Sequence, residues 1–249
     1  MNRFAPAALA LLAMSIGALS DSALAAPRQT LRPTANPGGV IAAEIGFAHL
    51  AQEKGQWTAF RATAAKGAKM FSPQPVLVAD FLKGRKDPTI AVKWQPHAVW
   101  SSCDGSIAVT RGAWQRPESA GYFITVWQRQ KDDQYKWVLD QGDDLPQPLA
   151  EPEAIEGVVA DCPPSGERNN PGREERNYPG HDGRHDPRRD AKAAAPQALA
   201  DPLNAAANDG TLAWATTVDA AGGRTFSLNL RKDGAMREVL HAGVKPSAG

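Results

Sequence analysis

The sequence has almost no net charge and, after residue 25, no long apolar run. Among 249 residues, 28 Lys and Arg balance 27 Asp and Glu, so the formal net charge is +1. A chain this close to neutral creates no overall field that would attract nucleic acid or an anionic membrane. No later stretch approaches the roughly 20 apolar residues that a membrane-spanning helix needs. We therefore expect no nucleic-acid partner and no membrane insertion.

Motifs that hold nucleotides, metals or a catalytic serine are also missing. The sequence contains neither a Gly-rich phosphate-binding loop nor the G-x-S-x-G pattern of serine hydrolases. The segment 181–186, His-Asp-Gly-Arg-His-Asp, resembles a metal-binding cluster. Gly183 and Pro187, however, deny it the helix that would preorganise two histidines around an ion. We expect no metal site and no cofactor.

Cysteine is scarce, with only Cys103 and Cys162 present. In an oxidising compartment, an even number of cysteines favours a bridge over free thiols. A nucleophilic Cys103 is the alternative, but no Cys-His or C-x-x-C arrangement lies near it. The residues that follow it, Asp104 and Gly105, are typical of a hairpin turn. We therefore predict a disulfide between Cys103 and Cys162.

The first 25 residues indicate export of the protein. Arg3 precedes an apolar run, and Ala23-Leu24-Ala25 has the small residues that signal peptidases recognise. We predict that residues 1–25 are a cleaved signal peptide and that the mature protein is periplasmic or secreted.

Composition and periodicity divide the mature chain into four parts. We expect a lead over residues 26–38, an α+β domain over 39–150, a disordered or irregular linker over 151–200, and a β-strand extension over 201–249. The linker is rich in Pro, Gly and charged residues and is poor in large apolar ones, so it cannot offset its ordering entropy by burial. The extension has too few strands to be stable alone, so it should dock on the first domain or on a partner.

Apolar spacing predicts the elements of the α+β domain. Helical periods, with Ile41, Ile45 and Ala48 on one face of the first helix, predict helices over 40–53, from Trp57 to Gly67, and over 75–84. A period of two then predicts an antiparallel meander of strands over 91–102, 107–115, 122–130 and 135–141. Large side chains alternate to both faces of the third of these strands. Both faces of the sheet therefore need a cover.

This order of elements resembles the SnoaL-like branch of the nuclear transport factor 2-like superfamily. The resemblance spans roughly residues 40–142, and five segments carry it: Trp94-Gln95-Pro96, Asp104-Gly105, Thr110-Arg111-Gly112-Ala113-Trp114, Val126-Trp127-Gln128-Arg129 and Lys136-Trp137-Val138-Leu139-Asp140. It implies a cone-shaped α+β fold, with N-terminal helices packed on a curved antiparallel sheet around a pocket. Many such domains are dimers, so it also implies a possible homodimer through the sheet face. The small C-terminal β extension lies outside the family pattern.

The resemblance transfers no catalytic set. Ketosteroid isomerases of this fold place a tyrosine on the first helix, where this chain offers Glu44 and His49. From the strand pattern, Asp140 is a candidate general base, a half-buried carboxylate with a raised pKa, or alternatively a structural hydrogen-bond acceptor. His97 follows a bend and is a second candidate acid or base, or else a solvated or structural histidine.

Aromatic residues and one arginine are candidates for binding a ligand. Trp57, Trp94, Tyr122 and Trp127 could line a pocket for a flat apolar molecule, although core packing explains them equally well. Arg111 lies among apolar strand residues and could hold a ligand carboxylate, or instead form an internal ion pair.

Three functional hypotheses follow from these residues, and the sequence leaves open whether the protein is an enzyme. The leading one is a periplasmic protein that binds a small apolar or aromatic molecule without turnover. The second is an isomerase, cyclase or dehydratase that uses Asp140. The third is an interaction module for another envelope protein. Buried carboxylates converging in a pocket would favour the second, and a broad exposed apolar sheet face would favour the third.

Overall fold

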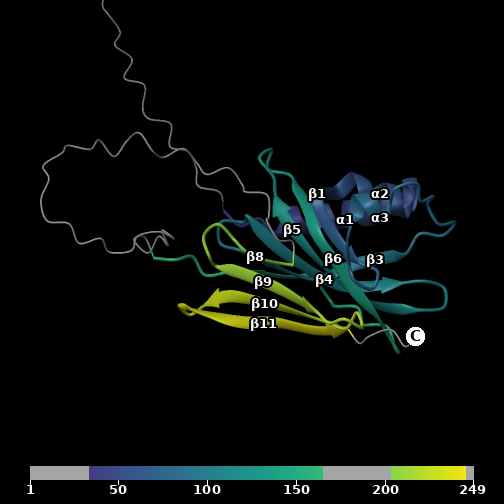
Figure 1. The fold of residues 1–249 in the computed structure, drawn as a ribbon. Coiled ribbons are helices and arrows are strands. Elements are labelled where there is room, and N and C mark those ends of the chain that lie inside the picture. The colour runs from purple at the N-terminus through teal and green to yellow at the C-terminus, as the bar shows by residue number, and fades with distance from the viewer. Residues whose placement is uncertain (1–33, 165–202, 245–249) are drawn as a thin grey trace, which may run out of the picture. The chain divides into compact units, whose positions relative to one another are not determined.

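Two sheets and three helices make up the part of the chain that the computed structural model describes, residues 34–164 and 203–244 (Figure 1). These residues belong to one compact unit, Arg32–Gly249. The helices are α1 (Pro37–Lys54), α2 (Gln56–Thr63) and α3 (Val78–Phe81). The strands of the first sheet are β1 (Ala64–Phe71), β2 (Pro75–Leu77), β3 (Lys93–Ser101), β4 (Ile107–Gln115), β5 (Ala120–Arg129), β6 (Tyr135–Leu145) and β7 (Glu156–Val159). Those of the second are β8 (Asn204–Ala206), β9 (Leu212–Val218), β10 (Arg224–Lys232) and β11 (Ala235–Val244). The predicted signal peptide and most of the predicted linker lie outside the described residues.

The first sheet, sheet A, has seven strands in the order β2-β1-β6-β5-β4-β3-β7. Its centre, β3 to β6, is the antiparallel meander that the sequence predicts. Gly105 has a φ of 66° in the turn between β3 and β4, as expected for an Asp-Gly hairpin. The prediction of a mixed fold, with N-terminal helices and an antiparallel sheet, is therefore confirmed for the order and pairing of β3 to β6. The sheet is larger than expected, because β1, β2 and β7 extend it.

The segment 64–84 was the least well predicted part of sheet A. The second helix ends at Thr63 rather than continuing to Gly67, and the chain then runs parallel to β6 as β1. Residues 75–77 pair with β1 as β2, and only one helical turn, α3, remains of the predicted third helix. Pairing with strands distant in sequence outweighs the weak local helical pattern of this segment. Similarly, β7 lies within the predicted linker and pairs with β3.

Helix α1 packs its most buried side chains on one face of sheet A. The helix begins where the Asn36 side chain accepts a hydrogen bond from the backbone N–H of Gly39 at 2.9 Å. Its buried face contains Val40, Glu44, Phe47, Ala48 and Ala51, rather than the expected Ile41 and Ile45. Ile45 is 38% exposed. The acidic Glu44 sits at the centre of the buried face, so a count of apolar residues alone indicates the wrong side of the helix.

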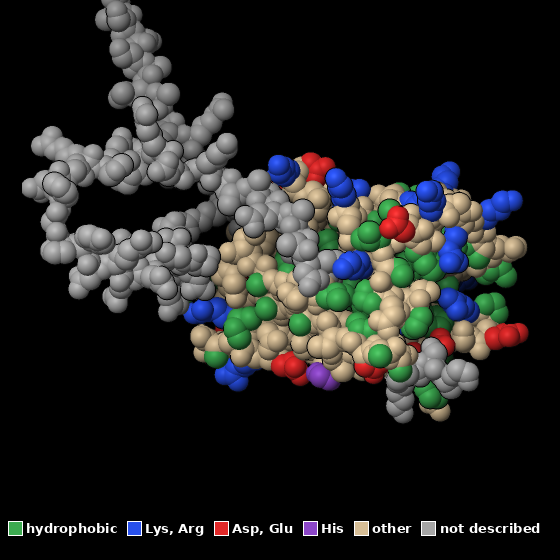
Figure 2. Space-filling model, in the orientation of Figure 1, with side chains coloured by type: hydrophobic (Ala, Val, Ile, Leu, Met, Phe, Trp, Pro, Cys, Tyr) green, Lys and Arg blue, Asp and Glu red, His purple; other side chains and the backbone are tan. Residues whose placement is uncertain are grey.

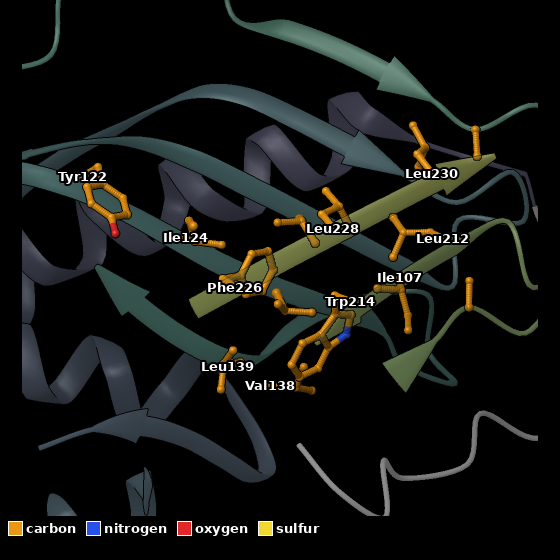
Figure 3. Packing of buried hydrophobic residues seen from close by; sticks show 14 residues of the cluster. Ile107, Tyr122, Ile124, Val138, Leu139, Leu212, Trp214, Phe226, Leu228 and Leu230 are labelled. Atoms are coloured by element: carbon orange, nitrogen blue, oxygen red, sulfur yellow. The ribbon is translucent and has the colours of Figure 1, made fainter. Parts of the chain in front are cut away.

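The opposite face of sheet A is covered by the second sheet, sheet B, whose strand order is β11-β10-β9-β8. Figure 3 shows side chains of β9 and β10 facing those of β4, β5 and β6, with Trp214 and Phe226 near the centre. Trp214 and Phe226 are stacked, with ring centroids 6.1 Å apart. The C-terminal extension therefore docks on the first domain, as one of the two predicted alternatives. It has four strands, and the homodimer through a sheet face stays a prediction.

A disulfide and several hydrogen bonds join the hairpin between β3 and β4 to its surroundings. Cys103 and Cys162 are bonded, with Cα atoms 5.2 Å apart, which confirms the predicted pairing. The backbone N–H of Cys103 donates to Thr211 Oγ1 at 2.9 Å, and that of Asp104 donates to Asp209 Oδ2 at 2.8 Å. The turn is thus attached both to the segment after β7 and to the turn between β8 and β9 of sheet B.

The surface shows no dominant charge on the face drawn in Figure 2, where Lys and Arg side chains alternate with Asp, Glu and hydrophobic ones. None of the helices in the described residues has the length and apolar character needed to cross a membrane.

Candidate functional site

A cavity of about 310 Å³ lies on the helix-facing side of sheet A. Aromatic side chains from helices and strands form one part of its wall: Phe47, Trp57, Phe60, Phe71, Trp94, Trp114 and Phe123. Charged side chains gather among the other lining residues: Arg116, Asp140, Asp143, Asp144 and Arg224. A cavity that combines an apolar surface with convergent polar groups is a usual form of a site for a small organic molecule.

Strand alternation determines which side chains of the meander reach this cavity. Thr125 is paired with Asp140 and Phe123 with Gly142 across β5 and β6. These residues lie on the helix side, whereas Tyr122, Ile124 and Val126 pack toward sheet B. Phe123 and Thr125 are two positions apart on β5 and therefore share a face, and Asp140 is the partner of Thr125 on β6. Phe123 and Asp140 therefore both reach the cavity.

The carboxyl group of Asp140 is the best placed titratable group in the cavity. Thr125 Oγ1 donates a hydrogen bond to Asp140 Oδ2 at 2.9 Å. Within residues 34–164 and 203–244, Asp140 Oδ1 accepts no hydrogen bond. Burial raises the pKa of Asp140 to about 7, and the negative charge of Glu44 contributes to this rise. The hydrogen bond from Thr125 and the positive charge of Arg224 act in the opposite direction. At neutral pH this carboxyl group can therefore either accept or donate a proton.

A second carboxyl group, that of Glu44, is fully buried between α1 and sheet A. Its Oε1 accepts a hydrogen bond from Trp94 Nε1 at 2.8 Å. Its Oε2 accepts hydrogen bonds from Thr110 Oγ1 at 2.6 Å and Trp127 Nε1 at 3.0 Å. Burial raises the pKa of Glu44, and these three hydrogen bonds offset part of the shift. With its oxygens occupied by protein donors, Glu44 fixes the helix on the sheet and stabilises the tryptophans, one of which lines the cavity.

The C-terminal sheet contributes one residue to the cavity, Arg224 at the start of β10. Its Nη2 donates to the backbone carbonyl of Gly142 at 2.7 Å, and its Nε donates to Gln141 Oε1 at 3.2 Å. The guanidinium carbon lies 4.6 Å from the centre of the Phe71 ring. Burial lowers the pKa of Arg224, and the nearby Tyr122, Asp143 and Asp140 oppose that shift.

The structure brings together three of the sequence-predicted site residues. Trp57, Trp94 and Asp140 all line the cavity. Trp127 lies in the core, 1% exposed, where it donates to Glu44. It therefore supports the cavity from behind rather than lining it.

Arg111, Tyr122 and His97 lie elsewhere. Tyr122 packs in the core between the two sheets, and its hydroxyl donates to the carbonyl of Gly243 at 3.2 Å. The Arg111 guanidinium lies 5.7 Å from the centre of the Tyr122 ring. His97 is half-buried outside the cavity lining, and its pKa is lowered by burial and by the charge of Arg111. The structure thus does not bring His97 and Asp140 together.

Two important residues, Glu44 and Arg224, were not proposed as site residues from the sequence. Glu44 carried a signal, because it falls between Val40 and Phe47 at helical spacing and so lies on a buried face. Arg224 carried none, because it is separated from β6 by a long segment and reaches the cavity only through the docking of sheet B.

Comparison with known proteins adds little to this geometry. No protein-family model matches the sequence, and no curated protein matches it. Among solved structures, the chain is similar to a candidate ketosteroid isomerase from Parabacteroides distasonis, with 16% identity and a TM-score of 0.35. The match covers 46% of this chain and 97% of that one. Both the identity and the TM-score are too low to transfer an activity.

Proposed function

We propose that this protein binds a small, largely apolar or aromatic molecule in the cavity between its helices and sheet A. The aromatic wall of the 310 Å³ cavity is the observation that carries the proposal. Flat apolar molecules gain most from such a wall, because aromatic side chains offer large surfaces for stacking and edge contacts. We place the protein in the periplasm or outside the cell, a location supported by its disulfide.

Substituting Trp57 tests whether this cavity is the binding site. Trp57→Ala should remove one wall and weaken binding of a hydrocarbon probe, 2-ethylnaphthalene, by about tenfold. Trp100→Ala is the matched control, because Trp100 is also a half-buried tryptophan but packs against the core between the sheets. Calorimetric titration of the folded variants gives both affinities. Native mass spectrometry of protein purified from its own periplasm should in addition show a bound small molecule. Equal weakening in the two variants would exclude the cavity as the site.

A second candidate function is acid-base catalysis on the bound molecule, of the isomerase, cyclase or dehydratase type. The specific observation in its favour is Asp140, which lines the cavity, whose pKa of about 7 is matched to neutral pH and whose Oδ1 has no hydrogen-bond partner among the described residues. A general base works best when its pKa lies near the operating pH.

The third hypothesis, an envelope interaction module, loses its main support because sheet B covers the sheet face it would need.

Asp140→Asn separates a proton-transferring carboxyl group from a structural one. An ionised Asp140 costs free energy mainly in the folded state, because its pKa there is about 7 against 3.8 ordinarily. That cost is absent below about pH 4, grows as the pH rises, and is complete above pH 7. The variant should therefore unfold at nearly the same temperature as the wild type at pH 4, and be more stable by up to about 4 kcal/mol at pH 8.

The comparison needs a matched acidic control and an activity readout. Asp80→Asn, at an exposed position in α3, should not reproduce the pH-dependent gain. If Asp140 is a general base, turnover of any identified substrate should fall about 100-fold or more in Asp140→Asn. A lower melting temperature at every pH would show instead that Asp140 is a structural acceptor.

A further inference from the structure

We infer that Arg224 binds a neutral carbonyl oxygen of the ligand, so that the C-terminal sheet completes the cavity and sets its ligand class. The inference rests on the proposed binding function and names the chemistry of the ligand. It assigns a binding role to a β extension that is otherwise only a cover for sheet A.

The position of the Arg224 guanidinium is set by its contacts with three residues of two strands of sheet A, β6 and β1. Hydrogen bonds to the Gly142 carbonyl and to Gln141 Oε1 use Nη2 and Nε. The Phe71 ring lies 4.6 Å from the guanidinium carbon, a distance at which a cation is attracted to an aromatic face. A planar guanidinium that is held at two nitrogens and over one ring is oriented before any ligand arrives.

The third nitrogen of this cavity-lining guanidinium, Nη1, is not used by the two hydrogen bonds to sheet A. Among the described residues Nη1 donates no hydrogen bond, and Arg224 forms no ion pair within 4.0 Å, although it is half-buried and lines the cavity. Partial burial without a full set of acceptors is unfavourable for a cation, and it is relieved when an acceptor oxygen enters. The free N–H groups are thus a preformed donor for a ligand.

The charges around Arg224 favour a neutral acceptor over an anion. Asp140, Asp143 and Asp144 also line the cavity, against the two cations Arg116 and Arg224. A ligand carboxylate would add a negative charge close to these acids, whereas a carbonyl oxygen accepts the same hydrogen bond without that repulsion. A hydrocarbon without oxygen would fill the aromatic part but would leave Nη1 unpaired. The cavity therefore fits an apolar or aromatic body that bears a ketone, lactone or quinone oxygen.

Three probes with one ring system test this assignment: 2-acetylnaphthalene, 2-ethylnaphthalene and 2-naphthoate. Titration calorimetry of the full chain should show the ketone binding about tenfold more tightly than the hydrocarbon, and the carboxylate more weakly than the ketone. In Arg224→Met the preference for the ketone over the hydrocarbon should disappear. Arg224→Lys, which keeps a charged donor but not the planar fork, should retain part of it.

Arg237→Met is the matched control, since Arg237 on β11 is exposed and pairs with Asp233 at 3.3 Å. It should keep the wild-type preference. The ratio of two affinities measured on one folded preparation is insensitive to any loss of stability caused by removing Arg224. Absence of binding by all three probes would overturn the proposed binding function and this inference together. Binding without a ketone preference, a preference that survives in Arg224→Met, or tightest binding of 2-naphthoate would overturn the assignment of Arg224 alone.

Discussion

Glu44→Ala should lower the free energy of unfolding by about 3–5 kcal/mol, the largest effect that we expect of any single substitution in this protein. Glu44 is 0% exposed and accepts hydrogen bonds from Trp94, Thr110 and Trp127. Alanine would leave the Trp94 indole N–H without its acceptor and would remove one acceptor from Trp127 and from Thr110, which keep only Thr110 Oγ1 and the Thr125 carbonyl. It would also open a void between α1 and sheet A. Equilibrium unfolding in urea, followed by tryptophan fluorescence, measures the change.

Glu44→Gln is the matched comparison, because it preserves the shape of the side chain. Its amide presents a donor where protein donors already point, so some destabilisation should remain, about 1–2 kcal/mol. The same variant removes the negative charge that helps to raise the pKa of Asp140, so that pKa should fall. If Glu44→Ala were as stable as the wild type, the three hydrogen bonds would not be what holds the helix on the sheet.

Removing the disulfide with Cys103→Ala and Cys162→Ala together should cost about 4 kcal/mol. The two cysteines are 59 residues apart in the chain, so the bridge closes a long loop and restricts the unfolded state strongly. It also anchors the turn between β3 and β4, whose backbone donates a hydrogen bond to Thr211 in the turn between β8 and β9. Urea unfolding of the double variant and of the oxidised wild type gives the difference.

Treatment of the wild type with a reductant provides an independent check of the same quantity. The reduced wild type and the double variant should unfold at similar urea concentrations, and the double variant should not respond to the reductant. A change of less than about 1 kcal/mol would mean that the unfolded chain gains little freedom when the bridge is absent.

The candidate site was only partly predictable, for reasons that particular residues make clear. Asp140 was proposed from the strand pattern, but a register shift between Val126 and Trp127 decides that it shares the helix-facing side with Trp137 and not the side of Val138. Arg111 and Tyr122 were assigned to the pocket although they lie on the sheet face toward sheet B. Alternation tells which residues share a face, but not which face receives the helices when both faces of a strand are apolar. Which face receives the helices is decided by the packing of α1 on one side of sheet A and of sheet B on the other.

Several properties of this protein were determined by its sequence alone. The antiparallel meander from β3 to β6 follows from a period of two and from turn residues such as Asp104 and Gly105. The pairing of Cys103 with Cys162 follows from having only two cysteines. These features depend on backbone preferences and on residue counts, which act without reference to distant parts of the chain.

Tertiary structure alone decided the rest. The strand β1, the buried face of α1 around Glu44 and the arrival of Arg224 at the cavity all depend on partners that are remote in sequence. In each case long-range burial and pairing outweigh a weak or misleading local pattern, because the free energy gained by covering both faces of sheet A exceeds local propensities. The local sequence therefore determines the meander, whereas the packing of the helices and of sheet B on sheet A determines which residues line the cavity.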